Sequence, residues 1–172
     1  MKKQILLLLS LALIVFGCSK DELVTPDDQA TYKNGVASKT IKFNKSTGTG
    51  EFSIEYPLLT ASIQGSGNAS QLGFFTVQNF GQRNMETGEY IDWYGVLTAA
   101  NGDKIFTQCV LGWTEDGIEY TQYNVLFGTG RFASLTGGEM LLYGTVELIP
   151  DPVDPYSGTL AWDLEGEGTL LY

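Results

Sequence analysis

The chain has 172 residues, with 20 acidic residues against 10 basic ones and no histidine, so its formal net charge is −10. This charge disfavours nucleic acids and acidic lipid surfaces as partners. The absence of histidine excludes Ser-His-Asp and Cys-His catalytic devices and histidine metal sites. Cys18 and Cys109 are the only cysteines, which excludes a disulfide scaffold and a cysteine zinc site. We therefore expect no metal and no cofactor.

The N-terminal residues resemble a targeting signal. Lys2 and Lys3 precede an apolar run over residues 5–16, which suits a signal peptide and is short for a membrane span. Gly17 and Cys18 follow directly, and a small residue before a cysteine at this place resembles the lipobox of bacterial lipoproteins. The resemblance implies that residues 1–17 are removed and that Cys18 is lipidated. A secretory signal with an incidental cysteine is the alternative.

The residues after Cys18 are polar. Asp21 and Glu22 resemble the surface-export signal of Bacteroidetes lipoproteins, although an ordinary solvated tether would have a similar composition. The resemblance implies a protein anchored in the outer membrane through Cys18 and exposed at the cell surface. The polar composition of residues 18–38 predicts a flexible tether that is lipidated at Cys18. The folded domain is expected over residues 39–172.

From residue 39 onward, short runs of β-branched and aromatic residues alternate with glycine-bearing turns, and no helical periodicity is sustained. A turn is predicted at "KSTGTG", and Asn101-Gly102 is the sharpest hairpin signal. Such short strands without helices predict an all-β fold, a single antiparallel β-barrel of about eight strands, with a β-sandwich as the alternative. The predicted strands are Thr40–Phe43, Gly50–Tyr56, Leu72–Phe80, Tyr90–Ala99, Lys104–Trp113, Ile118–Phe127, Glu139–Ile149 and Gly158–Tyr172.

Alternation within the strands predicts which faces are buried. Leu160, Trp162 and Leu164 share one face of the last strand, and acidic residues occupy the other. The strand Leu72–Phe80 has apolar side chains on both faces, which predicts that its outer face is covered, for example by a second subunit. Cys109 lies in an apolar run and is expected to be a buried, inert thiol.

The stretch "GTGRFASLTGG" (Gly128–Gly138) contains a glycine loop. A phosphate-binding loop would precede a helix, but the following "EMLLYGTVEL" favours a strand. The stretch resembles the signature of the calycin-like barrels of the allene oxide cyclase group, which plant dirigent proteins share. Gly65–Val77 and Thr98–Phe106 resemble segments of bacterial members. The resemblance implies a barrel that assembles into a homo-oligomer, a trimer in relatives. The motif is carried by Gly128, Gly130, Arg131, Phe132, Thr136 and Gly137, where the glycines bend the strand and Phe132 plugs the barrel.

The resemblance also implies a chemistry: an isomerase or cyclase that acts on an apolar substrate in the barrel and uses a carboxylate. No residue aligns with that carboxylate. Glu55 and Glu139 lie on predicted strands, but a solvated face is the competing interpretation for both. Asp151 and Asp154 are too few for a calcium site. We therefore predict no catalytic residue.

The binding of a small apolar ligand inside the barrel, or of a partner at its outer surface, is the favoured function, with the isomerase as the alternative. Arg131 could anchor a ligand carboxylate or pair with an acid at the barrel rim. The aromatic residues could line a cavity or fill the core. The candidate ligand-binding residues are Trp93, Tyr94, Trp113, Tyr120, Arg131 and Trp162.

Overall fold

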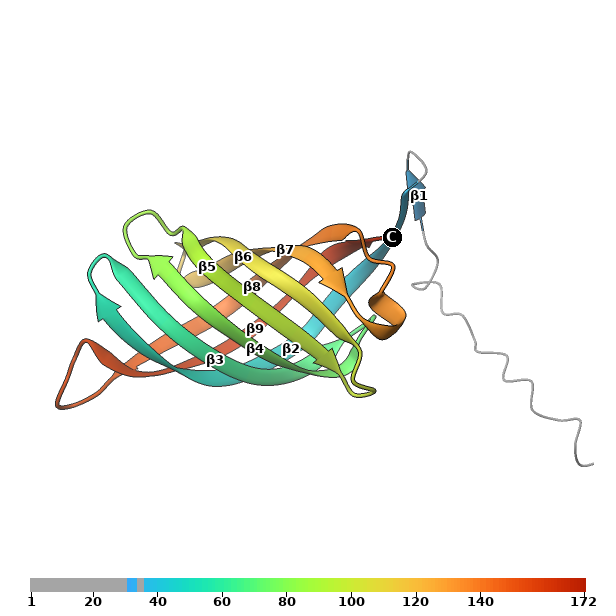
Figure 1. Ribbon diagram of the computed structural model, residues 1–172. Helices are drawn as coiled ribbons and strands as arrows, with labels where there is room; N and C mark the ends of the chain where they lie inside the picture. Colours follow the sequence, from blue (N-terminus) through green and yellow to red (C-terminus); the bar gives the residue numbers. More distant parts are fainter. Residues whose placement is uncertain (1–30, 34–35) are drawn as a thin grey trace, which may run out of the picture.

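The computed structural model describes residues 31–33 and 36–172 (Figure 1). The predicted signal peptide, the lipidation site at Cys18 and most of the predicted tether lie outside the described residues. The first described strand, β1 (Thr31–Lys33), pairs with the beginning of β2. Strand pairing therefore begins within the range predicted as tether.

The fold is a closed antiparallel barrel of eight strands, which confirms the predicted fold class. Each strand pairs with the next along the chain, and β2 also pairs with β9 to close the barrel. Within the described residues, every strand of the barrel therefore pairs with a neighbour on both sides. The barrel strands are β2 (Val36–Glu55), β3 (Leu58–Ala69), β4 (Gly73–Asn84), β5 (Tyr90–Ala99), β6 (Lys104–Glu115), β7 (Ile118–Gly128), β8 (Gly137–Pro150) and β9 (Ser157–Leu171).

The turn predicted at "KSTGTG" is wrong, because β2 runs through it. A bulge between Phe43 and Ser46 bends the strand there. Gly48 pairs with Gly65 of β3, and a Cβ on either glycine would collide with the opposite backbone and with the Trp162 ring. These glycines serve close approach between strands rather than a turn. β3 was not predicted as a strand because its sequence, "LLTASIQGSGNA", is rich in small and polar residues.

The barrel interior is apolar along most of its length. Ile41, Ile105 and Leu170 are completely buried. On β9, Leu160, Trp162 and Leu164 face inward, as predicted. Cys109 is also completely buried, and desolvation raises the pKa of its thiol.

One end of the barrel is closed. The short 3₁₀ helix η2 (Gly130–Phe132) lies there together with the C-terminus and the start of β2 (Figure 1). Phe132 is 2% exposed and is buried at this end, where the sequence predicts a plug. Gly130 has φ +59°, and a Cβ at this position would collide with the Asp103 carboxylate. The glycine stretch is thus a cap on the barrel and not a phosphate loop.

The opposite end is formed by four hairpins, which join β2 to β3, β4 to β5, β6 to β7 and β8 to β9 (Figure 1). Val146 and Leu148 of β8 belong to the inward-facing set of their strand, yet they are 43% and 37% exposed. Interior positions are therefore reached by solvent at this end, which we call the open end.

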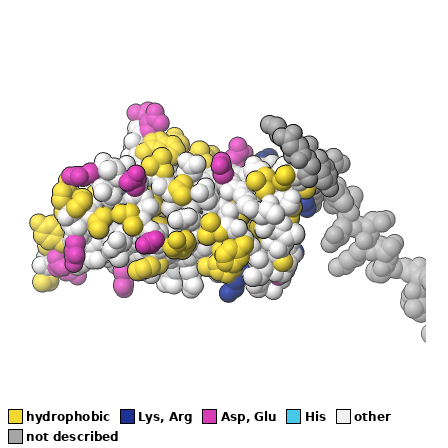
Figure 2. Space-filling model, turned by 45° about the horizontal axis from the view of Figure 1, so that its top comes forward, with side chains coloured by type: hydrophobic (Ala, Val, Ile, Leu, Met, Phe, Trp, Pro, Cys, Tyr) yellow, Lys and Arg dark blue, Asp and Glu magenta, His cyan; other side chains and the backbone are white. Residues whose placement is uncertain are grey.

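The outer surface mixes acidic and apolar side chains (Figure 2). Phe74 and Phe80 of β4 are exposed, whereas Phe75 and Val77 of the same strand are buried, so both faces of this strand are apolar as predicted. Among the described residues, no helix is long and apolar enough to cross a membrane.

A candidate ligand cavity at the open end

A cavity of about 320 Å³ lies inside the open end of the barrel. This volume is at the lower end of the range of small-molecule sites. Met85, Val146 and Leu148 are among its lining residues and are partly exposed, so the cavity opens to solvent at the hairpins. Every strand from β3 to β9 contributes to its wall. The lining residues are Leu59, Ile63, Arg83, Met85, Tyr90, Trp93, Thr114, Glu119, Thr121, Tyr123, Val146, Leu148, Leu160, Trp162 and Leu164.

The wall of the cavity has two chemical sides. Strands β3, β8 and β9 contribute aliphatic side chains and Trp162. Strands β4 to β7 contribute polar groups, among them Arg83, Thr114 and Glu119. A ligand inside would therefore meet an apolar wall on one side and a polar wall on the other.

Arg83 and Glu119 form an ion pair in this polar wall. Arg83 Nη1 lies 2.6 Å from Glu119 Oε1, and the two side chains are 24% and 9% exposed. The contact at Oε1 is electrostatic, since this oxygen makes no hydrogen bond of regular geometry despite the short distance. The Thr114 hydroxyl donates to the other oxygen, Oε2, at 2.7 Å. Both carboxylate oxygens of Glu119 are therefore engaged by the protein.

Aromatic packing holds the guanidinium in place. The Arg83 Cζ atom lies 5.4 Å from the centre of the Tyr90 ring, a cation–π distance. Tyr90 in turn packs edge-on against Trp93, with 4.8 Å between ring centres. A Cβ at Gly112 would lie 2.7 Å from Tyr90 Cε2 and 3.2 Å from Arg83 Nη2, so this glycine makes room for both side chains. Burial raises the pKa of the Tyr90 phenol.

Two tryptophans of the cavity wall have indole nitrogens without a hydrogen-bond partner. Trp93 and Trp162 line the cavity and are 6% and 8% exposed. Neither indole nitrogen has a hydrogen-bond partner. An indole N–H can only donate, and a buried donor without a partner costs about 1–3 kcal/mol. Both nitrogen atoms are themselves inaccessible to solvent, so a ligand would meet the rings rather than these donors.

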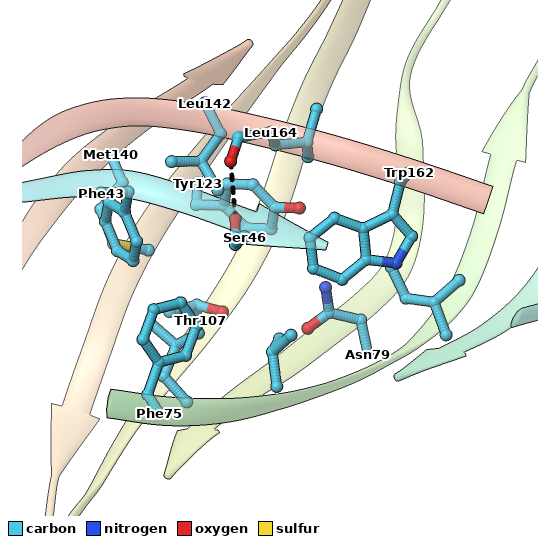
Figure 3. A pocket seen from close by; sticks show the side chains of 13 residues that line it. Phe43, Ser46, Phe75, Asn79, Thr107, Tyr123, Met140, Leu142, Trp162 and Leu164 are labelled. Carbon is cyan, nitrogen blue, oxygen red and sulfur yellow. Dashed lines mark hydrogen bonds between the residues drawn. The ribbon is translucent and has the colours of Figure 1, made fainter. Parts of the chain in front are cut away.

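A second, much smaller cavity of about 30 Å³ lies deeper in the barrel and shares Trp162, Tyr123 and Leu164 with the first (Figure 3). Its volume suits a water molecule rather than an organic ligand. Ser46 donates a hydrogen bond to the Leu164 carbonyl at 2.8 Å, and the Asn79 amide faces the Trp162 ring (Figure 3). The interior is therefore packed toward the closed end and hollow toward the open end.

The structure brings together two of the residues predicted from sequence to bind a ligand, Trp93 and Trp162. Tyr94, Trp113 and Tyr120 lie on the outside of the barrel, where Trp113 stacks on Tyr120 with 5.2 Å between ring centres. They face outward because side chains alternate along a strand and their neighbours fill the interior.

The other predicted side chains lie away from the cavity. Arg131 is at the closed end, where its Nε is 3.7 Å from Asp103 and its Nη2 donates to the Leu72 carbonyl at 3.2 Å. Such pairing with an acid at the rim was the alternative considered for this arginine. Glu55 and Glu139 are exposed.

Sequence reasoning missed the ion pair of the cavity. A signal for Glu119 existed, because it alternates with Thr121, Tyr123 and Val125, all of which face inward. The signal for Arg83 was weaker. This residue continues the alternation of Phe75, Val77 and Asn79 on β4, but it lies beyond the predicted strand Leu72–Phe80.

Among the residues that the structure describes, no group of three or more Cys, Asp or Glu side chains could hold a metal ion. Comparisons of the chain with known protein families, with curated proteins and with solved structures found no match.

Proposed function

We propose that this protein is a binding protein whose barrel takes up a small, largely apolar ligand through its open end. The observation that carries the proposal is the 320 Å³ cavity, which has an aliphatic wall and an opening to solvent. An eight-stranded barrel can fill its interior with side chains or hold one small ligand, and this one has space at one end only.

The isomerase suggested by the family resemblance is the less supported alternative. Glu119 is the one carboxylate among the residues that line the cavity. A general base must reach the proton that it removes, but Arg83 and Thr114 occupy the two oxygens of Glu119. This arrangement favours binding over catalysis.

The proposal also includes the location of the protein in the cell. We infer from the lipobox-like sequence that Cys18 anchors the protein in the outer membrane, at the cell surface. The chain enters the barrel at the start of β2, which lies at the closed end. With the anchor joined to that end, the open end faces away from the membrane and toward incoming ligand.

The exposed side chains of Phe74 and Phe80 support a homo-oligomer. They would lie between subunits, in agreement with the expectation from sequence. Light scattering at micromolar concentration should show a multiple of the monomer mass, and replacing both with Ser should reduce it to the monomer. A wild-type monomer would contradict this part of the proposal.

Tryptophan fluorescence tests ligand binding directly. The variant Trp113→Phe retains the two tryptophans of the cavity and removes the one outside. We expect its emission to change during titration with apolar compounds of about a dozen non-hydrogen atoms. Val146→Phe narrows the open end at a partly exposed position and should weaken the response. No response to any compound in the panel would exclude an internal ligand.

A further inference from the structure

We propose that the cavity selects apolar ligands that carry a carboxylate, which binds the Arg83 guanidinium. The inference rests on the proposed function and specifies its ligand class. It follows from two observations on the polar wall: the accessible guanidinium of Arg83 and the engaged oxygens of Glu119.

The guanidinium of Arg83 has donors to spare. Its Nη1 atom forms the ion pair with Glu119, and the guanidinium lies over the Tyr90 ring. Arginine presents several N–H donors in a planar fork that matches a carboxylate. Because the side chain is 24% exposed, a ligand can reach it from the cavity.

The carboxylate in the cavity is, by contrast, already used. Glu119 is only 9% exposed and touches Arg83 and Thr114. A ligand ammonium group would have to displace Arg83 from Glu119, whereas a ligand carboxylate can bind the free side of the guanidinium. The accessible guanidinium of Arg83 therefore favours an acceptor on the ligand, and its positive charge favours an anionic one.

The charge of Glu119 affects how tightly a ligand carboxylate binds to Arg83. This charge lies beside the proposed binding point of the ligand carboxylate and repels it. Replacing Glu119 with Gln removes this repulsion and keeps a group of nearly the same shape. The variant should therefore bind the acid more tightly than wild type does, an outcome that a purely structural ion pair would not produce.

Isothermal titration calorimetry with a matched series tests the inference: 2-naphthoate, 2-naphthylmethanol and 2-naphthylmethylamine. The protein is the mature chain from residue 18 with Cys18→Ala. We expect the acid to bind more tightly than the alcohol or the amine. Arg83→Gln should weaken the acid on the order of tenfold to a hundredfold, as the loss of a charge-assisted hydrogen bond does, and leave the alcohol nearly unchanged. Glu119→Gln should strengthen the acid.

The outcomes separate the two levels of the proposal. If none of the three compounds binds, the proposed function fails. If the acid and the alcohol bind alike, or the amine binds best, the cavity is a binding site but the carboxylate inference is overturned. Should Arg83→Gln fail to fold, Glu119→Gln still decides, because unchanged or weaker binding of the acid by that variant would contradict the inference.

Discussion

Arg83 and Glu119 meet 2.6 Å apart inside the barrel although they come from strands that are not neighbours, β4 and β7. Strands β5 and β6 lie between them in the sheet, so the two side chains meet within the lumen. The pair therefore links two distant parts of the wall and defines the polar side of the cavity. Its partial exposure on the Arg83 side limits its contribution to stability through solvent screening.

A double-mutant cycle measures this link. Removing one partner leaves the other charge uncompensated, so Arg83→Met and Glu119→Gln should each lower the free energy of unfolding by about 1–3 kcal/mol. The double variant should lose less than the sum of the two, by about 0.5 kcal/mol or more, because neither charge is left alone. Urea denaturation supplies the values. Strictly additive losses would show that the two residues do not interact in solution.

The second prediction concerns Phe132 at the closed end of the barrel. Phe132 is 2% exposed, so Phe132→Ala should cost about 3–5 kcal/mol of unfolding free energy. Phe74→Ala removes the same ring at a position that is 52% exposed and should cost no more than about 0.5 kcal/mol in the monomer. Thermal or urea denaturation compares them. Equal losses for the two variants would mean that Phe132 does not plug the barrel.

Stability should fall at alkaline pH. Burial raises the pKa of Tyr90, Cys109 and Tyr123 above ordinary values of 10.0, 9.0 and 10.0. The folded protein therefore retains protons that the unfolded chain releases above about pH 9, and the free energy of unfolding decreases there. Each group contributes up to about 1.4 kcal/mol per pH unit. Below pH 8 these groups cause no change.

Cys109→Ala is the matched control for this pH dependence. The variant lacks the group with the lowest ordinary value, so its decline should begin about one pH unit later, where the tyrosines take over. Unfolding curves recorded between pH 7 and 11 give the comparison. A flat stability profile in the wild type would contradict the burial of these groups.

The fourth prediction concerns the proposed lipidation of Cys18. Metabolic labelling with a fatty-acid analogue should mark the wild type and leave Cys18→Ala unlabelled, because the thiol of Cys18 is the proposed attachment point. Protease treatment of intact cells should then degrade the wild-type domain if it faces outward. Equal label in both proteins would show that Cys18 is not the anchor.

The general fold could be predicted because alternation and turn signals are local. The ranges of β5 and of much of β6 to β9 follow directly from apolar runs between glycine-bearing turns. The first half of the barrel was harder to predict, since Gly48 and Gly65 resemble turn residues in the sequence but allow close packing against Trp162 in the structure. The predicted strands Thr40–Phe43 and Gly50–Tyr56 both belong to β2, and β3 was not predicted. The predicted and observed numbers of strands therefore agree in part because these two errors cancel.

The site was predicted only in part, for a related reason. Aromatic residues were singled out by type, but strand register decides which of them face inward, so Trp93 lines the cavity while Tyr94 does not. The meeting of Arg83 with Glu119 depends on barrel closure, because their strands are not neighbours in the sheet. Such long-range geometry is not present in any local pattern.

The indole N–H signals of the three tryptophans test the central claim, that the cavity holds an apolar ligand, most directly. Trp93 and Trp162 line the cavity, and Trp113 lies outside it as a built-in control. In ¹⁵N-resolved NMR spectra during titration with 2-naphthoate, we predict that the first two signals move and that the Trp113 signal does not. Three unmoved signals, or a shift confined to Trp113, would contradict the account.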